Sequence, residues 1–139
     1  MAVISRTVAN FRLLENTVLS PQRVQVGEAV EPGQQLYLNT TDSKYYLTDN
    51  TDADKVVNPV VAANRGSADD YISIIITGDF EPGGTVTQGE VYFCAPTADK
   101  GEWLPIGDLV ASANMTMVAY GLNTTTLRLK IVEFGITHP

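Results

Sequence analysis

Two acidic stretches contain the side chains best suited to chemistry in this chain. TDNTDAD places carboxylates at Asp49, Asp52 and Asp54, and carboxylates at near-alternate positions are ligands that a hard cation such as Ca²⁺ prefers. A helix-loop-helix calcium site also needs a glycine at its sixth position and a glutamate at its twelfth, and the twelfth position here is Val60. We therefore expect a solvated turn and no metal site.

The second stretch, GDFEPGG, carries Asp79 and Glu81 on an expected loop. A carboxylate pair hydrolyses glycosides only where the fold places the two groups across a sugar. His138 is the only histidine, and it has no assignable Ser, Cys or Asp partner and lies in a stretch expected to fray. Cys94 lies in the apolar run VYFC and is expected to be a buried thiol. We expect no catalytic, cofactor-binding or metal site, and hence no enzyme.

Length and charge limit the classes of protein that fit. A chain of 139 residues suits one domain that folds without metal or disulfide. The net charge of −7 opposes nucleic-acid binding, and the chain has neither a membrane-length apolar run nor a signal-peptide core. Residues 1–26 carry three arginines and one glutamate, net +2, which leaves −9 for residues 27–139. This division predicts an N-terminal arm or first strand (1–26) and a β-rich domain (27–139).

Short apolar runs separated by Gly, Asn, Asp and Pro predict an all-β sandwich or barrel. Residues 71–77, YISIIIT, are nearly continuous and predict a central strand covered on both faces. Residues 127–134 alternate and predict a half-exposed strand. Residues 115–120 predict a strand, although 108–120 is also compatible with a short helix followed by a strand.

One short pattern occurs twice. VEPGQQLYL (30–38) and VTQGEVYFC (86–94) each place a valine, two residues, a glycine and then an apolar run. Gly33 and Gly89 are therefore expected in tight turns that need positive φ before a strand begins. The repetition is compatible with two related hairpins of an internally duplicated barrel, but chance recurrence of so short a pattern in a β protein is the favoured explanation.

The spaced glycines and apolar residues of GEAVEPGQQLYLNTTDSKYYLTDNTDADK and GGTVTQGEVYFCAPTADKGEWLPIGDL suggest a family. The order of the G-x-x-V-x-x-G turns, an acidic segment around Ala53, Lys100-Gly101 and Ile106-Gly107 resembles the capsid decoration, or cement, proteins of tailed bacteriophages. The resemblance covers residues 27–110. Asp108 departs from it, because the family often continues there into a valine-rich strand.

The resemblance implies a small β-barrel or β-tulip-like domain with an N-terminal arm, assembled as a homotrimer. It implies a virion protein on the outer face of the head that bridges subunits of the major capsid protein and holds the shell against packaged DNA. It implies no cofactor, no nucleic acid and no membrane as partners.

The N-terminal segment has two readings that the sequence leaves open. As an arm, it would make capsid or intersubunit contacts; alternatively, it is the first strand of the barrel. The contact residues expected for an arm are Val3, Ile4, Arg6, Phe11, Arg12, Leu13 and Leu14.

A receptor- or glycan-binding module of a tail fibre or tip is the rival function. Sugars stack on exposed aromatic rings, and this chain offers Tyr37, Tyr45, Tyr46, Tyr92 and Trp103. Most of these lie in apolar runs, so we expect them in the core.

Overall fold

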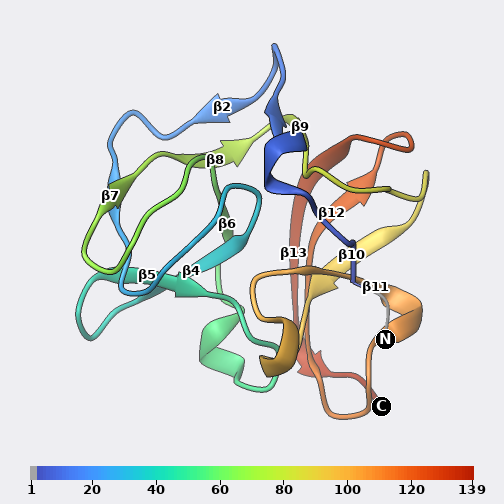
Figure 1. Cartoon of the computed structure of the whole chain (residues 1–139). Helices are drawn as coiled ribbons and strands as arrows, with labels where there is room; N and C mark the ends of the chain where they lie inside the picture. The colour runs from blue at the N-terminus through green and yellow to red at the C-terminus, as the bar shows by residue number, and fades with distance from the viewer. Residues whose placement is uncertain (1–2) are drawn as a thin grey trace.

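Residues 3–139 are described by the computed structural model, and within them short strands and single-turn 3-10 helices follow one another (Figure 1). None of these helices is long and apolar enough to cross a membrane. The strands are β1 (Arg12–Leu13), β2 (Val18–Leu19), β3 (Val24–Gln25), β4 (Gln35–Asn39), β5 (Lys44–Leu47), β6 (Val60–Ala62), β7 (Tyr71–Ile72), β8 (Ile74–Thr77), β9 (Asp79–Glu81), β10 (Val91–Cys94), β11 (Trp103–Pro105), β12 (Asn114–Gly121) and β13 (Leu127–Thr137). The helices are η1 (Val8–Asn10), η2 (Ala53–Lys55), η3 (Thr97–Asp99) and η4 (Ile106–Asp108).

The strands form two large curled sheets and one two-stranded sheet, so the all-β prediction is confirmed. The first large sheet has the order β2-β8-β6-β4-β5, and the second has the order β1-β9-β13-β12-β10-β11. β3 and β7 form the small sheet. In Figure 1 the first large sheet and the small sheet lie to the left, and β9 to β13 lie to the right.

The two large sheets repeat one topology. Without β1, the second sheet reads β9-β13-β12-β10-β11, which matches β2-β8-β6-β4-β5 strand for strand in chain order. The strand registers match as well. Leu36 in β4 pairs with Leu47 in β5, and the equivalent pair in the second sheet is Tyr92 in β10 with Pro105 in β11. The pair 62/74 between β6 and β8 is likewise equivalent to the pair 121/127 between β12 and β13. This agreement supports internal duplication, the alternative that the sequence pattern alone did not favour.

The two turn glycines occupy equivalent places in these repeats. Gly33 has φ +89° and Gly89 has φ +80°. Gln34 N–H donates to Glu31 O at 3.2 Å, and Glu90 N–H donates to Thr87 O at 3.1 Å. In both turns the positive-φ glycine is the third residue, as a type II turn requires. The predicted role of Gly33 and Gly89 is confirmed.

The two glycines differ in their surroundings, which gives a matched pair of substitutions. Gly89→Ala should cost about 1 kcal/mol for a side chain at positive φ, because nothing lies within 4 Å of the added Cβ. Gly33→Ala should cost roughly 2 kcal/mol or more, since its Cβ would also lie 2.9 Å from Arg6 Nη1 and 3.1 Å from Phe11. Chemical denaturation of both variants measures the difference, and equal losses would contradict the packing around Gly33.

One continuous strand segment passes from the first repeat to the second. β8 belongs to the first sheet, and β9, one residue later, belongs to the second. Gly78 lies between them with φ +101°, and a Cβ there would lie 2.1 Å from the Asn16 carbonyl oxygen. β1 and β2 run antiparallel to β9 and β8. Backbone that only glycine fits therefore lets one strand change sheets.

The largest apolar cluster lies where the two large sheets pack on each other. Phe80, Tyr92 and Trp103 supply its bulk, and their exposed fractions are 2 % or less. The ring centroids of Phe80 and Trp103 are 5.7 Å apart. Burial of large aromatic side chains such as these makes a large hydrophobic contribution to the free energy of folding.

The N-terminal segment packs against the body. Ile4 is 5 % exposed within the central cluster, and its N–H donates to Trp103 O at 3.0 Å. Phe11 lies against Phe80, with ring centroids 6.2 Å apart. β1 pairs with β9. These contacts favour the first-strand alternative for the described part of residues 1–26; Met1 and Ala2 lie outside the described residues.

Of the other strand predictions, one is confirmed and one is wrong. Residues 115–120 lie in β12, as predicted. The run 71–77 is divided at Ser73 into β7 and β8, which join different sheets, and β6 rather than β8 is central, so that prediction was wrong. Ile74 and Ile75 are buried in two different apolar clusters, one on each face of β8, whereas Ile76 is 43 % exposed, so only the first half of this strand is covered on both faces.

Candidate functional site

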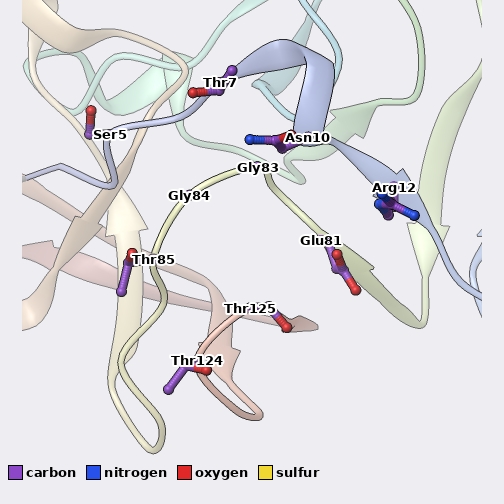
Figure 2. Close-up of a pocket in the computed structure, with 10 residues that line it drawn as sticks. All are labelled: Ser5, Thr7, Asn10, Arg12, Glu81, Gly83, Gly84, Thr85, Thr124 and Thr125. Carbon is purple, nitrogen blue, oxygen red and sulfur yellow. The ribbon is translucent and has the colours of Figure 1, made fainter.

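A polar cleft of about 510 Å³ lies between three segments of the chain. Figure 2 shows the N-terminal segment on one side, the loop after β9 on another and the β12–β13 turn below. The loop brings backbone close at Gly83, where a Cβ would meet Thr7 O at 2.5 Å. The side chains and glycines that line the cleft are Ser5, Thr7, Asn10, Arg12, Glu81, Gly83, Gly84, Thr85, Thr124 and Thr125.

Arg6 fixes the wall that the N-terminal segment contributes. Its Nε and Nη2 donate to both carboxylate oxygens of Glu102 at 2.7 and 2.8 Å, and Nη1 donates to Pro32 O at 2.8 Å. The Arg6 side chain is only 5 % exposed. A bidentate pair of this kind gives a defined geometry as well as energy, so neighbouring Ser5 and Thr7 are held in place.

The lining can form hydrogen bonds but lacks a catalytic pair. Hydroxyls and one amide dominate it, with Arg12 and Glu81 as its charged side chains. Their Cα atoms are cross-strand partners in the β1–β9 ladder. Glycoside hydrolysis normally uses two carboxylates, and this lining has one. The cleft suits a small ligand rich in hydroxyl groups.

Asp79 does not face Glu81 across the cleft. It accepts from Arg128 Nε at 2.7 Å and Nη2 at 2.9 Å, and from Asn16 Nδ2 at 2.9 Å. The hydrogen bonds from Arg128, opposed by burial and aided by Asn16, lower the pKa of Asp79 below its ordinary value. Asp79 is therefore a structural carboxylate rather than a general acid.

The Asp79 pair should make stability depend on pH. A carboxyl with a lowered folded-state pKa stabilises fully above the ordinary aspartate value of about 3.9, and this contribution is lost as pH falls through the folded-state pKa. The melting temperature of Asp79→Asn should therefore be lower than that of wild type at neutral pH, and the difference between the two melting temperatures should become smaller below about pH 4. Melting curves across this range measure it, with the exposed Asp54→Asn as control. A gap that is constant with pH would contradict the assignment.

The Asp49 stretch is less solvated than the sequence predicts. Asp49 is 5 % exposed and accepts from Thr51 Oγ1 and Thr97 Oγ1, both at 2.7 Å. Burial raises its pKa, but these hydrogen bonds outweigh burial and the net pKa is lowered. Asp52 caps η2 by accepting from Asp54 N–H. Within residues 3–139 no group of three or more His, Cys, Asp or Glu side chains is arranged to hold a metal ion.

Cys94 is in the core, as predicted, with an exposed fraction of 0 %. Burial raises the pKa of its thiol to about 12. The native protein should therefore resist iodoacetamide at about pH 8, whereas the protein in concentrated guanidinium should be labelled within minutes. Mass spectrometry measures the added group, and rapid labelling of native protein would contradict the burial.

The aromatic residues and His138 also have defined places. Trp103 and Tyr92 are buried in the central cluster, as predicted. Tyr37 is 7 % exposed, whereas Tyr45 and Tyr46 are half-buried. His138 was expected in a frayed tail, but its N–H donates to Ala113 O and its carbonyl accepts from Ser112 N–H, both at 2.8 Å. That prediction was wrong, because backbone hydrogen bonds fix this end to the turn before β12.

The seven residues expected to contact a capsid or another subunit separate into three groups by burial. Ile4 and Arg6 face the body of their own chain, so they are not available to a partner. Val3, Phe11 and Leu14 are half-buried. Arg12 and Leu13 are exposed, with Leu13 at 44 %. A partner contact by Arg12 and Leu13 stays a prediction.

Sequence reasoning missed the cleft and one exposed surface. The cleft joins residues from 5–12, 81–85 and 124–125, and no local pattern connects these segments. The exposed surface is the outer part of β13, where Ile131, Phe134 and Ile136 are solvent-accessible. The loss of strict alternation after Ile131 is the signal that could have revealed it.

Comparisons with known proteins leave the family open. No protein-family model, no curated protein and no solved structure matches this chain. The resemblance to capsid decoration proteins therefore remains a prediction from the spacing of residues 27–110.

Proposed function

We propose that this protein is a decoration, or cement, protein of a tailed-bacteriophage capsid. It binds the outer face of the head as a homotrimer, bridges neighbouring subunits of the major capsid protein and stabilises the shell against packaged DNA. In this proposal the domain is a small β-barrel or β-tulip-like body. It works by binding, without catalysis or a cofactor.

One observation carries the proposal. The residues that make the sequence resemble decoration proteins, the valine and glycine of each G-x-x-V-x-x-G, are the residues that build the two repeats. Val30 and Val86 are each 1 % exposed, and Gly33 and Gly89 form equivalent turns. The pattern therefore reflects architecture in this chain, which supports a family resemblance over chance recurrence.

The proposed mechanism is linkage. A protein that binds the mature shell and not its disrupted form stabilises the shell by mass action. Many symmetry-related copies add their small contributions. The acidic body is consistent with this role, because a net charge of −7 keeps the protein away from nucleic acid.

Co-sedimentation with shells that lack the protein tests the proposal. The purified protein should bind saturably, in a copy number that matches the lattice, and should raise the temperature at which DNA is released. An exposed double variant, Arg12→Ala with Leu13→Ala, should fold and bind less if β1 contributes to the contact. Folded wild-type protein that does not bind such shells would overturn the proposed function.

The polar cleft favours one second candidate, a glycan-binding module of a tail fibre or tip. Its hydroxyls, amide, guanidinium and carboxylate are groups that hydrogen-bond sugars. Binding of cell-surface glycans that is lost in Asn10→Ala and Glu81→Ala would support it. Stoichiometry separates the candidates, since a fibre tip is present in few copies per particle.

A further inference from the structure

The outer part of β13 has one free edge. β12 pairs with β13 along its length, from Gly121 opposite Leu127 to Asn114 opposite Thr137. On the other side β9 reaches only Leu127 and Arg128, followed by one hydrogen bond from Leu129 N–H to Gly78 O. Within residues 3–139 no strand forms a hydrogen-bonded ladder with this edge beyond Leu129. Free edges of this length are ready to pair with another chain.

The same segment is unusually apolar for an exposed strand. Ile131, Phe134 and Ile136 are 38 %, 45 % and 61 % exposed. Phe134 is held in place by stacking on buried Phe93, with ring centroids 5.9 Å apart and planes at 21°. Val57, 43 % exposed, lines the same small hollow as Ile136. We call the four exposed apolar residues of this region, Val57, Ile131, Phe134 and Ile136, the β13 strip; Ile131 and Phe134 lie on opposite faces of the strand, so the strip flanks its free edge on both sides.

Charge favours a second copy of this chain as the occupant. Residues 130–137 contain one base, Lys130, and one acid, Glu133, so the segment is neutral while the rest of the chain carries the net −7. Two copies that repel elsewhere can approach here. Lys130 of one copy can then pair with Glu133 of another: both residues are exposed, and among the described residues of its own chain only one carboxylate oxygen of Glu133 accepts, from Asn58 N–H at 3.3 Å.

The internal duplication gives a second reason. In the first repeat, β8 continues past its own sheet as β9, and β9 joins the sheet of the second repeat. By register, Leu127 is the equivalent of Ile74, so β13 is the equivalent of β8. β13 also continues beyond that register, through Thr137. Within this chain, continuation of that strand is how one repeat binds the next.

We infer that the β13 strip, with Lys130 and Glu133, is the surface through which copies of this chain associate. The inference rests on the self-association included in the proposed function, and it names the residues that provide it. The association buries the four apolar side chains of the strip and pairs the two charges between copies.

Light scattering across a concentration series tests the inference with a matched pair of isoleucines. The monomer mass is 15.0 kDa. Wild type should be larger than this, and Ile136→Lys should weaken association by roughly tenfold or more while the far-UV spectrum and melting curve stay native. Ile76→Lys, at a 43 % exposed position on β8 outside the strip, should associate like wild type. A monomeric wild type, or equal dissociation of both variants, overturns the inference.

Charge reversal provides an independent readout. Lys130→Glu and Glu133→Lys should each weaken association, and the double variant should restore it because the pair is re-formed with opposite polarity. Failure of the double variant to recover would remove Lys130 and Glu133 from the interface.

Shell binding by the same preparations separates this inference from the proposed function. Wild type that associates through the strip but does not bind shells keeps the inference and sinks the capsid role. Wild type that binds shells but stays monomeric in solution overturns the inference and keeps the capsid role.

Discussion

Removal of residues 1–14 is expected to leave a chain that has no cooperative unfolding transition. The deletion removes Ile4 from the central cluster and β1 from the edge of its sheet. It also removes Arg6 and so leaves Glu102, whose side chain is 18 % exposed, without its bidentate partner. Removing one partner of a buried ion pair while the other stays in place typically costs about 3–5 kcal/mol. This cost is a large part of the total stability of a small domain.

Circular dichroism during thermal unfolding measures this effect. The control is the double variant Arg12→Ala with Leu13→Ala, which retains the backbone of β1 and removes only exposed side chains. It should unfold cooperatively, within about 1 kcal/mol of wild type. A truncated chain with a native spectrum and an unchanged melting temperature would show that the segment is an arm after all.

Trp103→Ala is expected to destabilise the protein by about 3–5 kcal/mol. Its side chain is fully buried, lies against Phe80 and donates from Nε1 to Gly33 O at 2.8 Å. The substitution leaves a cavity between the two repeats and an unpaired carbonyl at the first turn. The cavity and the unpaired carbonyl both lie in the interface that holds the two repeats together.

Denaturant unfolding followed by far-UV circular dichroism measures this loss, because the variant has no tryptophan left for fluorescence. Trp103→Phe separates the two losses, since it retains most of the packing and should cost about 1–3 kcal/mol for the unpaired carbonyl and residual space. Tyr71→Ala, 59 % exposed, should change stability by about 0.5 kcal/mol or less. A Trp103→Ala loss no greater than that of Tyr71→Ala would contradict the central position of Trp103.

The features predictable from sequence are those set by local chemistry. A glycine three positions after a valine and before an apolar run predicted both turns, because positive φ is a property of single residues. Local apolar runs likewise predicted the strand at 115–120 and the buried thiol of Cys94. These features needed no knowledge of what lies across from them.

The failures came from features set by distant contacts. Residues 71–77 read as one strand, but Ser73 N–H donates to Asn64 Oδ1 at 2.8 Å, and the strand divides there between two sheets. Residues 1–26 read as a separate surface because of their charge, yet Arg6 is neutralised by Glu102, which is 96 positions away in the sequence. The polar cleft could not be predicted for the same reason.

The strand that changes sheets at Gly78 has a mechanical consequence. β8 and β9 are covalently continuous, and their partners β2 and β1 run alongside them in the opposite direction. A force that pulls the two repeats apart along this strand loads its hydrogen bonds in parallel, in shear, and not one after another as in unzipping. The repeats therefore share tension as one unit, and neither can yield first without stretching the strand that belongs to both.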